Sequence, residues 1–224
     1  MDLDFGSMLK YKDLFITGTF YTIFIAFITV AGGTVLGMFL SLLKLSKYKI
    51  LRFISSTYIE IFRGTPILVQ LYLIYFGVPQ ITDIRFSPLT AGIITLCLNS
   101  GAYVAELIRA GIMAVDKGQM EAARSLGMPL WRAMVFIVIP QAIKNILPAL
   151  ANEFIVIIKE SSIASIIGVN ELMYNTDTIR GNAFRPMEPL LITACIYFTM
   201  TFTLSKIIGY FERRMGDDSS RQTL

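Results

Sequence analysis

The uninterrupted apolar stretches of the chain constrain its fold more than any other feature. Residues 14–43 contain no charged side chain, and residues 89–104 and 190–204 are uncharged as well. A helix needs about 20 apolar residues to cross the hydrocarbon core of a membrane, and the first stretch exceeds that length. Only 16% of the residues are charged, against about a quarter in a typical soluble domain. The sequence therefore predicts an all-α integral membrane protein.

Five segments are expected to span the membrane. The third begins with Ser87 as cap and Pro88 at the first helical position, a pairing that is typical of helix starts. The predicted spans cover residues 14–43, 53–77, 88–110, 137–158 and 189–211. An odd number of spans without matching halves argues against the transporters that are built from inverted repeats.

The distribution of lysine and arginine among the loops predicts the orientation, because cytoplasmic loops are enriched in positive residues. One side holds twelve: Lys44, Lys47, Lys49, Arg52, Arg109, Lys117, Arg124, Arg132, Lys206, Arg213, Arg214 and Arg221. The other side holds five: Lys10, Lys12, Arg85, Arg180 and Arg185. We therefore expect a multi-pass protein of the cell membrane, with residues 1–13 outside and the tail, residues 213–224, in the cytoplasm. The net charge of +4 then reflects topology and implies no nucleic-acid partner.

Several kinds of chemistry are excluded by the residue types that the chain lacks. It has no histidine, which excludes imidazole metal centres and histidine proton relays. Cys97 and Cys195 lie in apolar segments and are expected to be packing residues. No GxxxxGK[ST] phosphate-binding loop is present, so the chain is not expected to hydrolyse ATP. The sequence predicts neither a catalytic site nor a metal site.

A short polar helix is predicted in the loop after the third span. Asp116 and Gln119 have the spacing of a capping box, and Gly127 followed by Pro129 ends the helix. A helix of about two turns is too short to be stable alone. Either another protein packs on it, or it only covers the end of the helix bundle.

The residues of this helix suit recognition by a partner. Ala122 and Ala123 leave little side-chain bulk, and Glu121 and Arg124 lie one turn apart as a charge pair. The spaced pattern is Glu121-Ala122-Ala123, three residues, Gly127, nine residues, Ile137, one residue, Ile139-Pro140. It resembles the EAA loop of ABC importer permeases and departs from it only at Ile139, where leucine is usual.

The resemblance implies a role for this helix. In that family the helix, here residues 117–128, inserts into a separate ATPase subunit and transmits its motion to the membrane part. Glu121, Ala122, Ala123, Arg124 and Gly127 would then couple the chain to ATP hydrolysis.

Longer stretches narrow the resemblance to the permeases of polar amino-acid importers, which serve histidine, glutamine, glutamate, arginine or lysine. These stretches are EIFRGTPILVQL (60–71), YVAELIRAGI (103–112), GQMEAARSLGM (118–128) and PQAIKNILPALANEFIVIIKESSI (140–163). The resemblance covers residues 14–212 and implies an ABC importer type I permease fold that pairs with a second copy or a homologue. It also implies a pair of subunits that bind ATP and magnesium, no cofactor in this chain, and an extracytoplasmic binding protein.

Charged residues within a span are functional candidates, because each costs about 2.5–3.5 kcal/mol at the bilayer centre. The second span carries Glu60 and Arg63 on one face, where they bind substrate or neutralise each other as an ion pair. Glu106, in the third span, is expected to pair with Arg109.

Gly64, Thr65 and Pro66 form a helix-weakening triplet in the second span. The proline has no backbone N–H, so the carbonyl of Phe62 loses its usual donor. Backbone opened at membrane depth is tolerated only where it is buried in protein or lines a cavity. The triplet is therefore predicted to line the cavity that holds substrate.

The third span presents a polar stripe at Asn99 and Tyr103, with Ser100 beside it. Amides and hydroxyls in membrane helices also hydrogen-bond to neighbouring helices. The stripe therefore predicts either contact with substrate or attachment between helices.

The fourth span is the richest in polar groups. It is interrupted by prolines, and Glu153 and Glu160 recur on one face. We expect a break after Glu160, where Ser161 or Ser162 caps a short helix whose free N-terminus binds a carboxylate. A structural pair between Lys159 and Glu160 is the competing interpretation.

Glu60, Glu153 and Glu160 together favour a cationic substrate. The leading hypothesis is a permease for a basic amino acid: arginine, lysine or histidine. A glutamine or glutamate permease stays open, because Arg63 or Lys159 can offset the acids. A membrane channel and a membrane anchor without transport activity are the alternatives from other classes.

Overall fold

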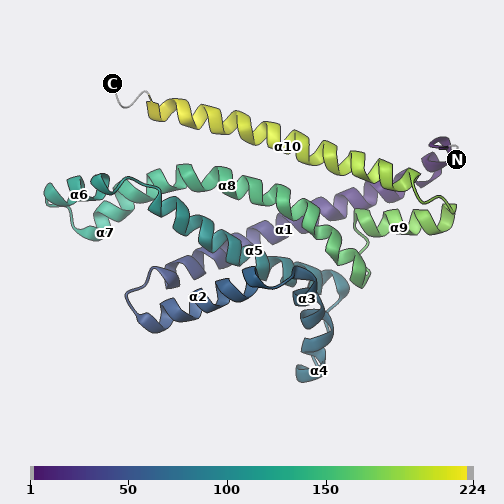
Figure 1. The fold of residues 1–224 in the computed structure, drawn as a ribbon, viewed down its shortest axis with the longest axis horizontal. Coiled ribbons are helices and arrows are strands. Elements are labelled where there is room, and N and C mark those ends of the chain that lie inside the picture. Colours follow the sequence, from purple (N-terminus) through teal and green to yellow (C-terminus); the bar gives the residue numbers. More distant parts are fainter. Residues whose placement is uncertain (1–2, 221–224) are drawn as a thin grey trace.

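The computed structural model describes the backbone of residues 3–220 and the side chains of residues 3–214. All regular secondary structure in this part of the chain is helical (Figure 1). Its helices are η1 (Gly6–Tyr11), α1 (Lys12–Lys44), α2 (Lys49–Gly64), α3 (Ile67–Tyr72), η2 (Leu73–Gly77), α4 (Val78–Thr82), α5 (Pro88–Met113), α6 (Lys117–Ser125), α7 (Leu130–Ala133), η3 (Met134–Val138), α8 (Ile139–Glu160), η4 (Ser161–Ile167), α9 (Leu172–Ala183) and α10 (Glu188–Ser220).

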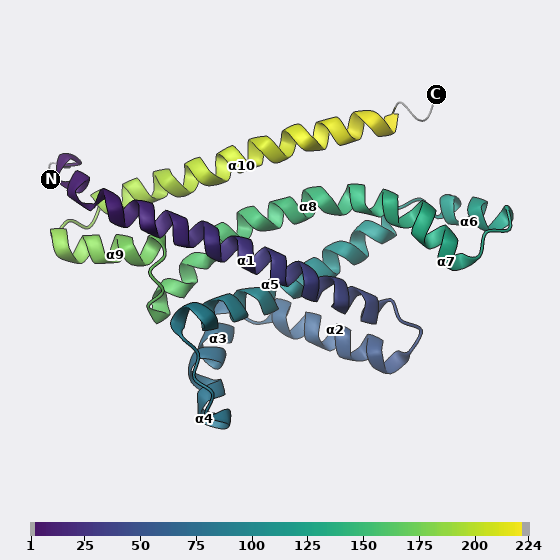
Figure 2. The ribbon, with the colours of Figure 1, turned by 180° about the vertical axis from the view of Figure 1, so that it is seen from behind.

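Four uninterrupted helical stretches are long and apolar enough to cross a membrane, and the bent pair of α2 with α3–α4 makes up to five. α1, α5, α8 and α10 extend along the long axis of the molecule (Figures 1 and 2). The α1–α2 loop, α6 and the C-terminal end of α10 lie at one end, which we call the α6 end, and the N-terminus and α9 lie at the other. The loops that the charge pattern assigned to one side thus share one end.

α10 extends further than the predicted fifth span. The predicted tail, residues 213–224, begins inside this helix, and residues 221–224 lie outside the described part of the chain. Ser87 caps α5 as predicted, because its hydroxyl oxygen accepts a hydrogen bond from the backbone N–H of Thr90.

The most extensive contact between helices in the described chain joins α1 to α5. A Cβ atom placed on Gly33 would lie 2.8 Å from Oγ of Ser100, and one placed on Gly37 would lie 2.7 Å from Cβ of Val104. Glycines spaced by four residues on one helix face allow two membrane helices to approach closely. Glycine is therefore required on this face of α1, and the contact fixes α5 at the centre of the bundle.

We expect Gly37→Ile to destabilise the protein by about 1–3 kcal/mol, because its side chain would overpack the α1–α5 contact. The thermal unfolding midpoint of the purified protein in detergent measures the effect. Gly209→Ile, in α10, is the matched control, because a Cβ atom there meets nothing within 4 Å. Equal midpoints for the two variants would contradict the close-packing argument.

The second predicted span is a bent pair of helices rather than one straight helix. α2 ends at Gly64, and the segment from α3 to α4 leaves it at an angle of 107°. The limb formed by α3 and α4 points away from the bundle (Figure 1). The bend falls at the triplet that the sequence marks as helix-weakening.

The fourth predicted span is longer than expected, from Leu130 to Ile167. The prolines in it do not break the helix: Pro140 follows the π-helical turn η3, and Pro148 lies inside α8. A π turn is often found at functional sites, and here it takes up the backbone change next to a proline.

α9 was not predicted from the sequence, and the acidic side chain of Glu171 holds its start. Glu171 is fully buried and accepts hydrogen bonds from the backbone N–H of Tyr174 at 2.8 Å and the hydroxyl of Tyr197 at 3.1 Å. The hydroxyl of Thr22 lies 3.4 Å from the same carboxylate. Glu171 thus ties α9 to α1 and α10.

Burial raises the pKa of the Glu171 carboxyl, and hydrogen bonds from its neighbours oppose the rise only in part. An unfolded glutamate titrates near pH 4.3. Because the pKa is higher in the folded chain, the stability that the neutral carboxyl contributes is complete below that pH and is lost as the pH rises through the folded value.

We therefore expect Glu171→Gln, which cannot ionise, to gain thermal stability relative to the native protein as the pH rises from about 4 to about 8. Tyr197→Phe removes a donor to the carboxylate, so the loss of stability with pH should become steeper than in the native protein. Unfolding midpoints measured across this pH range test both. Parallel pH curves for all three proteins would contradict the assignment to Glu171.

Candidate functional site

The bend in the second span is held by two buried amides. Nε2 of Gln70 lies 2.9 Å from the carbonyl oxygen of Phe62, 3.1 Å from that of Thr65 and 2.9 Å from Oγ1 of Thr65. Nδ2 of Asn99, on α5, lies 3.1 Å from the Phe62 carbonyl oxygen and 3.0 Å from Oε1 of Gln70. The carbonyl that Pro66 deprives of its helical donor is therefore satisfied by side chains.

The exposed surface of the bend consists of the predicted triplet. Gly64, Thr65 and Pro66 are exposed in the single chain, and a Cβ atom on Gly64 would meet nothing within 4 Å. The Thr65 hydroxyl donates to the carbonyl of Ile61 at 2.8 Å and accepts from Gln70, so it is already used within the chain. Asn99 is 5% exposed and contacts this backbone. It therefore attaches α5 to the bend, which is one of the two roles that the sequence allowed.

A buried acid lies on the other side of α5. Glu153, on α8, is 8% exposed, and its Oε1 accepts a hydrogen bond from Oγ of Ser100 at 3.0 Å. This is the one hydrogen bond to the carboxylate within the described residues, so Oε2 has no partner there. Ser100 in turn packs against Gly33, so the α1–α5 contact positions the acid.

The charged residues of α2 do not neutralise each other. No ion pair joins Glu60 to Arg63 among the described residues, and Glu60 is exposed. The Arg63 guanidinium lies over the ring of Tyr103, 5.3 Å from its centroid. Tyr103 is 39% exposed, so this pair lies on a surface that is open in the single chain.

The break predicted after Glu160 is absent. α8 continues directly into the 3₁₀ helix η4, and the hydroxyls of Ser161 and Ser162 donate backward to the carbonyls of Ile158 and Lys159 at 2.9 and 2.7 Å. Serine hydroxyls inside a helix bond to the preceding turn in this way. The prediction of a capped, free helix N-terminus at Ser161 was wrong.

Glu160 itself is half-buried and has no ion pair or hydrogen bond within the described residues. The competing interpretation, a Lys159–Glu160 ion pair, is therefore also not seen there. The positive charge of Lys159 nevertheless acts on the Glu160 carboxylate.

Glu106 forms the expected pair with Arg109 and a second one that the sequence did not predict. Nε of Arg109 lies 2.7 Å from Oε1 of Glu106, and Nζ of Lys44 lies 2.9 Å from Oε2. This cluster links α1 to α5 near the α6 end, and it keeps Glu106 out of any site for a further cation.

The short polar helix begins and ends where predicted, but without the reciprocal bond of a capping box, because the Gln119 side chain accepts from Gln141 instead. The Asp116 carboxylate accepts from the backbone N–H of Gly118 at 2.6 Å. Gly127 has a φ of +83°, and the N–H groups of Gly127 and Met128 donate to the carbonyls of Arg124 and Ala123. These bonds form a Schellman motif, for which glycine is strongly preferred.

The outer surface of α6 differs in part from the prediction. Ala122 is exposed, but Ala123 faces inward and is 7% exposed. The Arg124 guanidinium donates to the carbonyl of Met128 at 3.0 Å, and no ion pair joins it to Glu121 among the described residues. Glu121 and Leu126 instead stand exposed on the open side, Leu126 at 88%.

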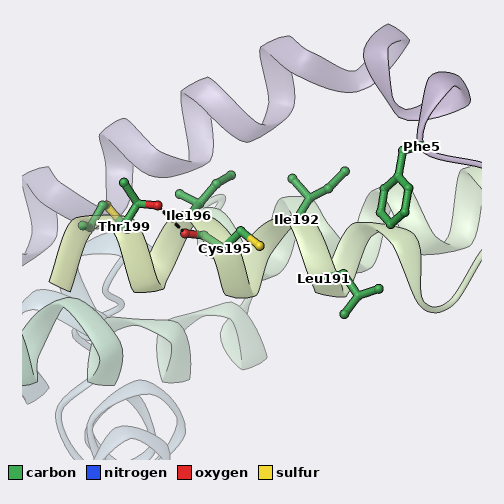
Figure 3. Close-up of a pocket in the computed structure, with 7 residues that line it drawn as sticks. Phe5, Leu191, Ile192, Cys195, Ile196 and Thr199 are labelled. Carbon is green, nitrogen blue, oxygen red and sulfur yellow. Dashed lines mark hydrogen bonds between the residues drawn. The ribbon is translucent and has the colours of Figure 1, made fainter. Parts of the chain in front are cut away.

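A groove of about 530 Å³ lies between Phe5 and α10, and none of the candidate acids lines it (Figure 3). Leu191, Ile192 and Ile196 contribute to its apolar lining, and the Thr199 hydroxyl donates to the carbonyl of Cys195 at 2.8 Å. A groove without charged residues does not suit a polar amino acid. Its apolar lining instead suits contact with the lipid around a membrane helix.

The structure thus brings together some of the predicted residues and not others. Ser100 contacts Glu153, and Asn99 contacts the backbone of the bend, whereas Glu60 and Glu160 contact none of the other candidates through a hydrogen bond. Gln70 was missed, although a glutamine four residues after a helix-breaking proline is a usable signal. The described residues include no cluster of acids and cysteines that could hold a metal ion.

Comparison with known proteins gives the family. Residues 33–217 match the family described as the binding-protein-dependent transport system inner membrane component. A Rickettsia typhi protein, provisionally named the glutamine transport system permease protein GlnP, is 46% identical over 93% of this chain and 99% of its own. The arginine transport system permease protein ArtQ of Bacillus subtilis is 39% identical over 96% of this chain and 98% of its own.

A solved structure gives the same answer. The crystal structure of an amino acid ABC transporter with histidines contains a chain that is 53% identical, with a TM-score of 0.93, over 96% of this chain and 100% of that one. The match favours a permease over a channel or a membrane anchor. It also confirms the resemblance of the sequence to the permeases of polar amino-acid importers. The chain belongs to the binding-protein-dependent inner membrane components and is a non-catalytic, multi-pass permease subunit of the polar amino-acid ABC importer family.

Proposed function

We propose that this permease forms the translocation path for a basic amino acid, namely arginine, lysine or histidine, and works by alternating access. The observation that carries the proposal is the Glu153 carboxylate, which is almost fully buried and has one hydrogen bond, from Ser100. An ionised carboxylate in a membrane interior is costly unless a positive group pairs with it. A cationic substrate would supply that group.

The surroundings of Glu153 support a cation over a neutral substrate. Glu60 and Glu160 have no ion pair in the described chain, while Arg63 is turned to the ring of Tyr103. The arginine permease among the relatives and the transporter solved with histidines agree with a basic substrate. We propose Ser100, Asn99 and the Gly64-Thr65-Pro66 triplet as the frame of the site, with Tyr103 and Ser161 at its margin.

Glutamine is the second candidate, and glutamate belongs to the same alternative. The relative named for glutamine transport is 46% identical, compared with 39% for the arginine permease. The positive charges of Arg63 and Lys159 could offset the acids for an uncharged side chain.

The family supports an assembly of several subunits. As a binding-protein-dependent ABC component, the chain implies ATPase and binding-protein partners. We propose a dimer with a second permease copy or a homologue, and two ATP-binding subunits that hold ATP and magnesium. The α6 end would face the cytoplasm and the N-terminus the outside, with residues 1–13 as an external segment, 14–212 as the membrane domain and 213–224 as the tail.

In this assembly α6 would be the coupling helix, within residues 117–128. Glu121, Ala122 and Leu126 form its open side, and the cap at Asp116 and the Schellman motif at Gly127 fix its ends. A lever of two turns has to be rigid to pass on a displacement, and both ends are held by hydrogen bonds. Ala123 and Arg124 would hold the helix to its own chain.

The substrate role of Glu153 is tested by Glu153→Ala and Glu153→Gln in the complex reconstituted with its ATPase and binding protein. We expect the arginine concentration that half-maximally stimulates ATP hydrolysis to rise at least about tenfold, since hydrogen bonds to charged groups contribute about 1.5–3 kcal/mol. Glu212→Gln, exposed on α10, is the matched control. An unchanged response to arginine would remove Glu153 from the site.

The same assay on the native complex separates the two substrates. Stimulation by arginine, lysine or histidine supports a basic substrate, and stimulation by glutamine alone would overturn that part of the proposal and favour the alternative.

The coupling role of α6 is tested by Gly127→Val. A β-branched residue is strained at a φ of +83°, so the end of α6 should deform and ATP hydrolysis should no longer drive uptake. Gly181→Val, at a position with open space and no positive φ, is the control. Normal uptake per ATP in Gly127→Val would contradict the lever argument, provided that both variants insert into the membrane equally.

A further inference from the structure

The Gln70 side chain is almost fully buried, with 6% of its surface exposed, at the root of the limb that α3 and α4 form (Figure 1). A primary amide offers two N–H donors and one carbonyl acceptor. The two N–H groups of Gln70 are shared among three acceptors, namely the Phe62 and Thr65 carbonyls and the Thr65 hydroxyl, and its amide oxygen accepts from Asn99. Both ends of this amide are therefore occupied.

Only an amide of this length satisfies both sides of the bend. A methionine would leave the Phe62 and Thr65 carbonyls with fewer donors, and a glutamate would place acceptors against acceptors. The Gln70 side chain extends from α3 back to the end of α2, so it closes the bend across the triplet. Without it, Asn99 would be the one side chain of the described residues that still donates to the Phe62 carbonyl, and apolar packing of Leu71 would have to hold α3 in place.

Asn99 connects this bend to the acid. Asn99 contacts Gln70 and Phe62, and the next residue, Ser100, donates to Glu153. Consecutive residues on a helix point about 100° apart, so one turn of α5 faces both the bend and α8. That turn is itself held against Gly33 of α1, which leaves it little freedom to shift.

We infer that Gln70 is a positioning residue for transport: it fixes the Gly64-Thr65-Pro66 triplet, which we propose as part of the site, relative to Glu153 through Asn99 and Ser100. Loss of its amide would let the bend relax and would change the distance between the two sides of the site. The inference rests on the proposed role of Glu153 in binding substrate. It assigns a function to a residue that does not itself touch substrate.

The test uses Gln70→Met, which keeps the length of the side chain and removes its hydrogen bonds. In the reconstituted complex we expect the half-saturating arginine concentration to rise about tenfold. Gln80→Met is the matched control, because Gln80 is an exposed glutamine on the same limb. If Gln70→Met is not recovered folded, Gln70→Asn, which retracts the amide by one methylene, provides the same measurement.

A second measurement needs no substrate. Thermal unfolding midpoints of Gln70→Met, Asn99→Leu and the double variant form a cycle, and non-additive losses establish that the two amides act as a pair. Additive losses would overturn the inference.

The results separate the two proposals. A raised half-saturating concentration in both Gln70→Met and Glu153→Ala supports the inference. A normal value in Gln70→Met with a raised one in Glu153→Ala overturns the positioning role and leaves the substrate site intact. A third outcome is a half-saturating arginine concentration that is normal in both variants, together with non-additive changes in the unfolding midpoints. It would remove Glu153 from the substrate site and leave Gln70 with a structural role only, which also overturns the inference.

Discussion

The carbonyl of Phe62 is the constraint on which the arrangement of the site depends. In hydrocarbon an unpaired backbone carbonyl costs several kcal/mol, and Pro66 removes the N–H that would normally pair with it. The chain resolves this with the amides of Gln70 and Asn99. A bend at this point is possible only because α3 and α5 each bring an amide to it.

The position of α5 in turn depends on its close approach to α1. Glycines on α1 leave room for Ser100 and Val104, so α5 lies at the centre with the bend on one side and α8 on the other. Glu153 therefore has its hydrogen bond from a residue that the α1–α5 contact holds in place. Packing of apolar and small residues, rather than charge, sets the geometry in which the charges act.

Sequence patterns that depend on neighbouring residues were predictable. The uncharged stretches predicted the spans, Pro66 predicted the orphaned carbonyl, and Asp116 and Gly127 predicted the ends of the polar helix, because each depends on the backbone within one helical turn. Features that depend on contacts with residues far away in the chain were less predictable. Serine is a residue type that often caps helices, which is why Ser161 was predicted to begin a new helix. Continuing the existing helix into η4 is more favourable than starting a new one there. α9 was missed because its start depends on Glu171, whose partners Thr22 and Tyr197 are far away in the chain.

By itself the sequence determined the membrane class, the family resemblance and the place where the second span weakens. It did so because hydrophobic length, capping chemistry and the missing proline N–H are properties of short segments. The tertiary structure alone decided which polar groups meet: Asn99 with the bend, Ser100 with Glu153, and Arg63 with Tyr103 rather than Glu60. These pairings depend on how the four or five candidate spans approach one another, and a residue's helix face does not reveal which neighbour will occupy it.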